Sequence, residues 1–348
     1  MDHPEALVWL SFGGPEKPSD VRPFLENVTR GRGVPPSRLD EVEHHYQSFG
    51  GISPINALNR TAIAAVESLL AREGLALPIY FGNRNWHPLI EDTVASLASE
   101  GIERALVFAT SAYGGYSACR QYDEDITRAR TAAGPSAPEL LKLRQFFDHP
   151  LFIAAFADSV RAAALTLPAS YRLVFTAHSV PMSADKAAGP LSEGGYRYSR
   201  QVAEAARLVA ASVGVGEYDV VWQSRSGPPA IPWLEPDIVD HMEALHASGV
   251  EAVLVCPVGF VSDHLEVVWD LDTEAADKAA ELGMAFARAA TPGGDPRFAE
   301  LVVELVREQV EGVPARKLSG FPADGCTVNG EPCAVDCCTP VRRPARSG

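Results

Sequence analysis

Short apolar runs that alternate with longer, Ala-rich segments constrain the fold of this chain more than any other feature. Each apolar run has the length of a buried strand, and several of the longer segments show helical periodicity and end at glycine. This alternation is typical of α/β proteins with parallel sheets. Strands are predicted at residues 6–12, 77–83, 104–113, 171–180, 218–225 and 251–261.

The alternation occurs twice, which suits a chain of 348 residues and predicts two similar domains. The boundary is expected near 147–165, giving an N-terminal domain over 1–155 and a C-terminal domain over 156–290. Residues 291–313 include an amphipathic helix that we expect to pack back on the first half. Residues 314–348 lose all periodicity, which predicts an irregular tail that is held by metal ligation or not at all.

The acidic composition argues against a protein that binds nucleic acid or an anionic lipid surface. With 30 Lys and Arg against 45 Asp and Glu, the formal net charge is -15. Nucleic acids and anionic lipid surfaces both need a basic face, so neither is expected as a partner. No apolar run reaches the ~20 residues of a membrane-spanning helix. The N-terminus lacks a basic region before its short apolar stretch, so we expect no signal peptide and a cytoplasmic protein.

Three carboxylates stand four residues apart after the last long strand. Read as a helix, the segment puts Glu266, Asp270 and Glu274 on one face, where each like-charged pair costs roughly 0.2–0.5 kcal/mol. A capping box with Ser262 or Asp263 at the N-cap would explain Glu266. It would not explain the two carboxylates beyond the first turn. The alternatives are a solvated acidic face and a path for a cation.

His178 ends an apolar strand, where an imidazole can bind a divalent metal or accept a proton near pH 7. The alternative is a structural histidine that is hydrogen-bonded at the strand end. Carboxylates suit hard divalent ions and imidazole suits iron and zinc, so together they favour a transient cation route. Other strand ends carry polar or aromatic residues, which predicts a ligand cleft between the halves. The turn FGGPEKP lacks the GxGxxG spacing, so no nucleotide cofactor is predicted.

Four of the six cysteines crowd into the tail. In a cytosolic chain such a cluster is more typical of a metal or iron–sulfur site than of disulfides. The adjacent Cys337 and Cys338 rarely both bind one centre, so we prefer three tail ligands and the remote Cys119. The alternative is a disordered tail with free thiols.

The ordered motifs TAHSVP, GGYRYSRQ, VWQSRSGPPAIPWLEP and CPVGFVSDHLEVVWDLDTE resemble the ferrochelatase family. LSFGGPE, FGGISPIN, FGNRNWHP and SAYGGYSACRQY extend the resemblance over residues 6 to 310. It implies a chelatase fold, in which two similar Rossmann-like domains with parallel sheets enclose a porphyrin. It also implies insertion of Fe(II) into that porphyrin with release of two protons and without a nucleotide.

The resemblance implies roles for individual residues. His178 and Glu266 are the expected catalytic pair, and with Asp270 and Glu274 they form the expected metal route. Some bacterial members carry a Tyr that ligates product iron where this chain has a phenylalanine. The expected porphyrin-binding residues are Phe12, Arg30, Tyr46, Ser53 and Tyr122. Expected partners of the porphyrin carboxylates include Arg30, Arg32, Arg197, Arg200 and Arg225.

The tail resembles family members that carry a [2Fe–2S] cluster on one internal and three C-terminal cysteines. We expect the ligands Cys119, Cys326, Cys333 and Cys338. The short N-terminus without a membrane-docking lip resembles the coproporphyrin branch, so coproporphyrin III is the expected substrate and protoporphyrin IX the alternative. A cobalt chelatase and a tetrapyrrole carrier are rival functions. Transient contact with neighbouring haem-pathway enzymes is also expected.

Overall fold

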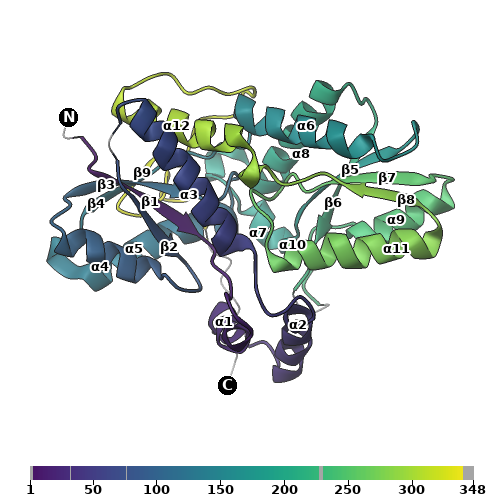
Figure 1. Cartoon of the computed structure of the whole chain (residues 1–348), viewed down its shortest axis with the longest axis horizontal. Helices are drawn as coiled ribbons and strands as arrows, with labels where there is room; N and C mark the ends of the chain where they lie inside the picture. The colour runs from purple at the N-terminus through teal and green to yellow at the C-terminus, as the bar shows by residue number, and fades with distance from the viewer. Residues whose placement is uncertain (1–2, 32, 76, 227–229, 340–348) are drawn as a thin grey trace.

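Two β-sheets lie side by side and organise the molecule (Figure 1). The computed structural model describes residues 3–31, 33–75, 77–226 and 230–339. The five-stranded sheet has the order β2-β1-β3-β4-β9 and the four-stranded sheet the order β6-β5-β7-β8. The strands are β1 (Ala6–Ser11), β2 (Ile79–Asn83), β3 (Arg104–Ala109), β4 (Glu139–Lys142), β5 (Arg172–His178), β6 (Tyr218–Gln223), β7 (Ala252–Cys256), β8 (Ala285–Arg288) and β9 (Thr327–Val328).

The sheets are parallel apart from one added strand at an edge. Within the described residues every strand pair is parallel except β4 with β9, in which Lys142 faces Thr327. This confirms the predicted α/β class with parallel-dominated sheets. The predicted strands 104–113 and 251–261 are too long, since they end at Ala109 and Cys256. The chain leaves the sheet there and turns toward the region between the halves.

Helices connect the strands and cover the sheets (Figure 1). The Ala-rich segments predicted as helices form α3, α4 and α8, and Gly214 ends α8 in the left-handed conformation. The helices are α1 (Val21–Val28), α2 (Pro36–Ser48), α3 (Ile55–Arg72), α4 (Ile90–Ser99), α5 (Gln121–Ala133), α6 (Pro150–Ala164), α7 (Met182–Lys186), α8 (Arg197–Val213), α9 (Ile238–Ala247), α10 (Leu265–Trp269), α11 (Ala276–Leu282) and α12 (Pro296–Val310). Residues Tyr116–Arg120 and Asp270–Ala275 form π-helical turns.

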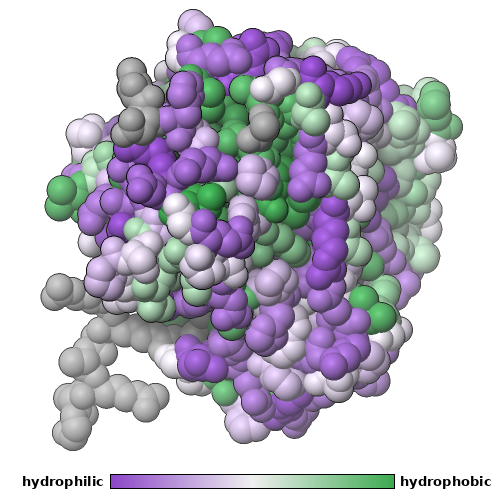
Figure 2. All heavy atoms as spheres, turned by 60° about the vertical axis from the view of Figure 1, so that its left-hand side comes forward, coloured by the Kyte–Doolittle hydropathy of each residue, from purple (hydrophilic) through white to green (hydrophobic). Residues whose placement is uncertain are grey.

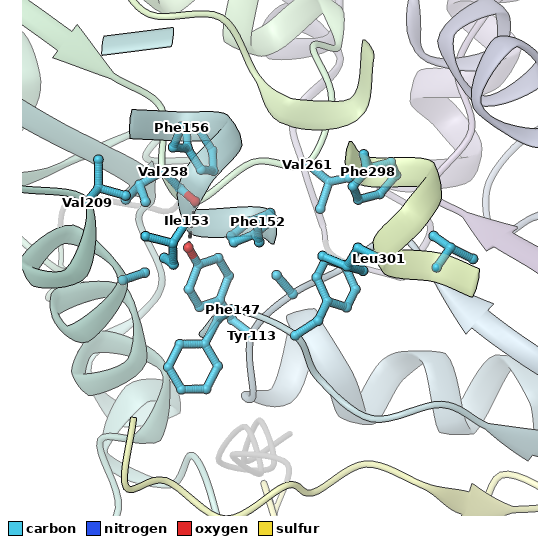
Figure 3. Packing of buried hydrophobic residues seen from close by; sticks show 14 of the residues in the cluster. Tyr113, Phe147, Phe152, Ile153, Phe156, Val209, Val258, Val261, Phe298 and Leu301 are labelled. Carbon is cyan, nitrogen blue, oxygen red and sulfur yellow. Dashed lines mark hydrogen bonds between the residues drawn. The ribbon is translucent and has the colours of Figure 1, made fainter. Parts of the chain in front are cut away.

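A continuous hydrophobic core joins the two halves. Helix α12 packs against α3 of the first half and α6 of the second. The hydroxyl of Tyr113, which follows β3, donates a buried hydrogen bond of 2.5 Å to the carbonyl of Val258, which follows β7 (Figure 3). Phe147 and Ile153 lie beside Tyr113 in the same cluster. The carboxyl ends of the two sheets are therefore held in a fixed relation.

The tail packs on the body of the molecule. Strand β9 covers the edge of β4, whose backbone groups would otherwise lack ladder partners. Cys337 and Cys338 are buried. The expectation that the tail is irregular throughout is therefore wrong for residues 327 and 328, which pair with β4. Metal ligation of the tail stays a prediction.

Helices α1 and α2 project from the first half, and α2 reaches the second (Figure 1). The ring of His45 on α2 stacks on Trp269 at the end of α10, with centroids 3.8 Å apart and planes 9° apart. Figure 2 shows one face on which hydrophobic side chains are exposed in a hollow that hydrophilic ones surround. Among the described residues, none of the helices combines the length and the hydropathy that a bilayer crossing requires.

Candidate active site

His178 and Glu266 form the centre of the site. His178 is the last residue of β5, and Glu266 lies in the first turn of α10, directly after the chain that follows β7. The imidazole Nε2 is 3.7 Å from the carboxylate Oε2, and the side chains are 36% and 43% exposed. The Nδ1 atom lies 2.6 Å from the carbonyl oxygen of Ser179. Because a carbonyl only accepts, Nδ1 carries the proton and the Nε2 lone pair of the neutral ring faces Glu266.

Each member of this pair changes the pKa of the other. Burial disfavours the charged form of His178, but the Glu266 carboxylate outweighs it and raises the pKa of the imidazole. Burial likewise opposes ionisation of Glu266, and the charge of a protonated His178 at 3.7 Å lowers the pKa of that carboxyl. The pair therefore favours an imidazolium beside a carboxylate, which stabilises a proton once His178 has accepted it.

The carboxylates after Glu266 lie on a helix that is not regular. Helix α10 ends at Trp269, and the chain continues through the π-turn Asp270–Ala275 into α11. The prediction of a regular helix is wrong at this point, because a π-turn bonds residues five apart and rotates the side chains that follow it. The indole of Trp269 donates accordingly to Glu274, five residues on, at 2.8 Å.

Asp270 is the buried member of the line. Its Oδ2 accepts hydrogen bonds from Gln223 Nε2 at 3.2 Å and from the hydroxyl of Ser224. Burial and the nearby Glu266 carboxylate raise the pKa of Asp270 to about 7. Glu274 is exposed. The three carboxyl groups thus run from solvent at Glu274, through the buried Asp270, to Glu266 opposite His178, and Asp270 gains or loses a proton near neutral pH.

Aromatic residues of the first half face this line. Burial and the Glu266 carboxylate both raise the pKa of the Tyr46 phenol, which places that ring on α2 within electrostatic range of Glu266. The Tyr46 ring lies 6.0 Å from Phe24, and Phe24 lies 6.4 Å from Phe12. Phe12 directly follows β1 and is 36% exposed. Tyr46, Phe24 and Phe12 therefore form an apolar wall whose Tyr46 end lies near Glu266, an arrangement that suits a flat apolar ligand that reacts with a cation.

The sequence profile of the ferrochelatase family matches residues 4–310. The chain belongs to the ferrochelatase family. The coproporphyrin III ferrochelatase of Nocardia farcinica (strain IFM 10152) is 68% identical over 348 residues, which cover 99% of each chain. The coproporphyrin III ferrochelatase of Mycolicibacterium smegmatis is 61% identical over 340 residues, which cover 96% of this chain and 98% of the relative.

Two solved structures share the fold. SirB from Bacillus subtilis with Fe3+ has a TM-score of 0.53 at 13% identity and covers 89% of this chain and 98% of its own. The sirohydrochlorin chelatase SirB from Bacillus subtilis subspecies spizizenii in complex with cobalt has a TM-score of 0.54 at 14% identity, covering 89% and 96%. These likenesses confirm the predicted chelatase fold.

Two of the residues expected at the porphyrin lie below the surface of this ferrochelatase. Ser53 is buried against the turn at Gly14. Tyr122 is buried as well, with the Arg84 guanidinium 4.1 Å above its ring. Contact of either residue with a porphyrin stays a prediction. Arg30 is exposed just after α1.

Three of the arginines expected to bind porphyrin carboxylates already contact other side chains of the protein. Arg197 is buried and pairs with Glu193 and with Asp324 of the tail, so its assignment to a porphyrin carboxylate is wrong. The two carboxylates neutralise the positive charge of Arg197, so this charge is not available to a ligand. Arg200 lies 5.3 Å above the ring of Phe321, and Arg225 pairs with Glu235 at 3.1 Å. Arg32 lies outside the described residues.

The cysteines gather around one buried lysine. Cys119 Sγ accepts hydrogen bonds from Lys142 Nζ at 3.0 Å and from Gln145 Nε2 at 2.6 Å. The sulfur of Cys337 lies 3.3 Å from that of Cys333 and 3.7 Å from that of Cys338, while Cys326 contacts Gln309 at 3.3 Å. Over the described ranges, no three His, Cys, Asp or Glu side chains are grouped as a ready metal site.

Sequence reasoning missed several residues that shape the site. Gln223 and Ser224 hold Asp270, and Gln223 pairs with His178 in the register of β5 and β6. Aligning the carboxyl ends of these two strands would have identified Gln223. The N-cap residue of α10 is His264, and no side-chain hydrogen bond caps this helix. The interpretation of Ser262 or Asp263 as the N-cap of a capping box is therefore wrong. Asp263 binds Arg288 instead, at 3.0 and 3.1 Å.

The pKa of His178 gives a prediction for the pH dependence of iron insertion. The imidazole accepts a proton only when neutral, so kcat/KM falls as pH drops through the raised pKa of His178. In Glu266→Gln the carboxylate is gone while burial remains, so the pKa of His178 falls and this acidic limb moves to lower pH. Glu274→Gln is the control and leaves the limb in place. An unmoved limb in Glu266→Gln, measured from pH-rate profiles, contradicts the assignment.

Proposed function

We propose that this ferrochelatase inserts Fe(II) into coproporphyrin III and yields Fe-coproporphyrin and two protons as a step of haem synthesis. The observation that carries the proposal is the His178–Glu266 pair, which joins a proton acceptor and a metal-binding carboxylate at a partly exposed position. The relatives described above, which cover nearly the whole chain, are named for this substrate.

His178 is the proposed acceptor of the pyrrole protons. Its Nδ1–H bond to the Ser179 carbonyl fixes the ring and leaves Nε2 directed toward Glu266. When Nε2 takes a proton, the adjacent carboxylate stabilises the imidazolium that forms. Removing protons from the porphyrin nitrogens makes their lone pairs available to the incoming cation, so proton acceptance and metal insertion are coupled at this position.

The carboxyl line is the proposed entry route for Fe(II). Hard oxygen donors suit a hydrated divalent cation, and imidazole suits iron once water has been lost. Glu274 at the surface would meet the hydrated ion first. Because the pKa of Asp270 is raised to about 7, an arriving dication easily displaces its proton. Glu266 then receives the ion opposite His178.

Contacts on the first half are proposed for the macrocycle. Phe12 and Tyr46 supply the apolar wall described above, and Phe12 cannot act as an axial oxygen ligand to product iron because it has no hydroxyl group. Arg30 is the exposed cation proposed for a propionate. Coproporphyrin III carries four propionates, which makes it a water-soluble substrate. Protoporphyrin IX is the competing substrate in the test.

Anaerobic Fe(II) insertion with coproporphyrin III and protoporphyrin IX side by side tests the proposal. We expect strong preference for coproporphyrin III, measured as the ratio of kcat/KM values. His178→Ala should lose about 10²- to 10⁴-fold in rate, the usual contribution of a general base. His241→Ala removes a histidine of the same domain that pairs with Asp219 instead, and should retain activity. Preference for protoporphyrin IX overturns the substrate assignment, and normal turnover by His178→Ala overturns the mechanism.

We also propose that the cysteine region holds a [2Fe–2S] cluster on Cys119, Cys326, Cys333 and Cys338. The donor set fits, since thiolates are the usual ligands of such clusters and hydrogen bonds to sulfur stabilise them. Cys119 already receives two buried donors, and the Lys142 ammonium is also a charged neighbour of Cys326 and Cys333. When bound, the cluster would cross-link the tail to the body and supply a one-electron redox centre.

Single Cys→Ser variants, purified anaerobically, test the cluster and its ligands. The readouts are iron and acid-labile sulfide per chain and the visible absorption. We expect loss in the Cys119, Cys326, Cys333 and Cys338 variants and retention in Cys337→Ser. The buried Cys256, which lies in β7, serves as the control. Absence of sulfide in the unaltered protein contradicts the cluster, and loss in Cys337→Ser with retention in Cys326→Ser reassigns the fourth ligand.

A further inference from the structure

Arg288, the last residue of β8, binds two carboxylates on the segment that carries Glu266. Its Nη1 and Nη2 donate to the two oxygens of Asp263 at 3.0 and 3.1 Å. Its Nε and Nη2 donate to the two oxygens of Asp272 at 2.6 and 2.9 Å. One planar guanidinium thus makes two bidentate contacts, a geometry that the single ammonium of lysine cannot reproduce.

The two carboxylates flank the catalytic part of the helix. Asp263 immediately precedes the N-cap residue of α10, and Asp272 lies inside the π-turn. Glu266 and Asp270 lie between them in the sequence. Arg288 therefore fixes both ends of the stretch whose conformation decides where these two carboxyl groups point.

A π-turn needs support from outside the helix, because its hydrogen bonding is less favourable than that of an α-helix. Gln223 and Ser224 bind Asp270 from one side. Trp269 stacks on His45 of the first half. The side chain of Arg288 is 15% exposed, more buried than the side chain of either aspartate that it binds. Since these carboxylates are partly solvated, we assign the contact a geometric role and not a large energetic one.

We propose that Arg288 is a positioning residue for metal insertion, which holds Asp263 and Asp272 together so that the π-turn presents Glu266 to His178 and Asp270 to Gln223. This inference rests on the proposed function and goes beyond it, because Arg288 contacts neither the metal route nor His178. Asp263, although it lies three residues before Glu266 in the sequence, then serves as an anchor and not as an acid or base.

Kinetics of Arg288→Met, Arg288→Lys and Arg172→Met test the proposal. Arg172 is the matched control, because it also binds two carboxylates of this domain, Asp219 at 2.7 Å and Glu217 at 3.0 Å, but from the opposite end of the sheet. Displacement of a reacting group by an ångström costs on the order of a hundredfold in rate, so we expect kcat of Arg288→Met to fall about tenfold to hundredfold. The KM for coproporphyrin III should stay nearly unchanged, and Arg288→Lys should recover part of the rate.

Two kinetic results would overturn the proposed role of Arg288. A kcat of Arg288→Met equal to that of the unaltered protein, or an equal loss in Arg172→Met, overturns the proposal. If Arg288→Met does not fold, Asp272→Asn replaces it, since it weakens the contact to the π-turn and keeps the one to Asp263. Hydrogen exchange of residues 265 to 275 must then rise in Asp272→Asn and not in Arg172→Met. If the unaltered protein inserts no iron, the proposed function fails, while the exchange experiment still tests the positioning.

Discussion

The contact between His178 and Glu266 is the interaction on which the proposed mechanism depends. It joins a strand end of one sheet to the helix that follows a neighbouring strand, and parallel pairing of β5 with β7 brings both to the same edge. The imidazole is fixed by the Ser179 carbonyl. The carboxylate is fixed by a helical segment that Arg288, Gln223 and His45 contact from outside. The imidazole Nε2 and the carboxylate Oε2 thus lie 3.7 Å apart, as the proposed coupling of proton acceptance and metal binding requires.

The sequence predicted the parts of this arrangement that depend on local pattern. His178 could be placed because apolar runs mark strands and parallel strands gather their carboxyl ends. The repeat of like charges at helical spacing singled out Glu266 and Asp270, but their assignment to a metal route came from the resemblance to the ferrochelatase family. The two-sheet α/β fold followed from the alternation of short apolar runs with periodic segments.

The parts that depend on long-range contacts could not be predicted. A π-turn leaves no periodic signal, so the spacing of Asp270 and Glu274 was taken for a regular helix. Arg288 is one of 30 basic residues, and only the pairing of β8 with β7 brings it to Asp263. Arg197 seemed available to a ligand because its neutralising partner Asp324 lies in the distant tail. The tail itself was expected to be irregular, since a two-residue strand is too short to show alternation.

Crystals of the porphyrin-free protein, soaked anaerobically with Fe(II) and measured at the iron absorption edge, test the central claim most directly. We predict an anomalous peak in contact with His178 Nε2 and Glu266, which disappears in Glu266→Gln. A peak elsewhere with none between these two side chains would contradict the assignment of the pair as the point where iron is delivered.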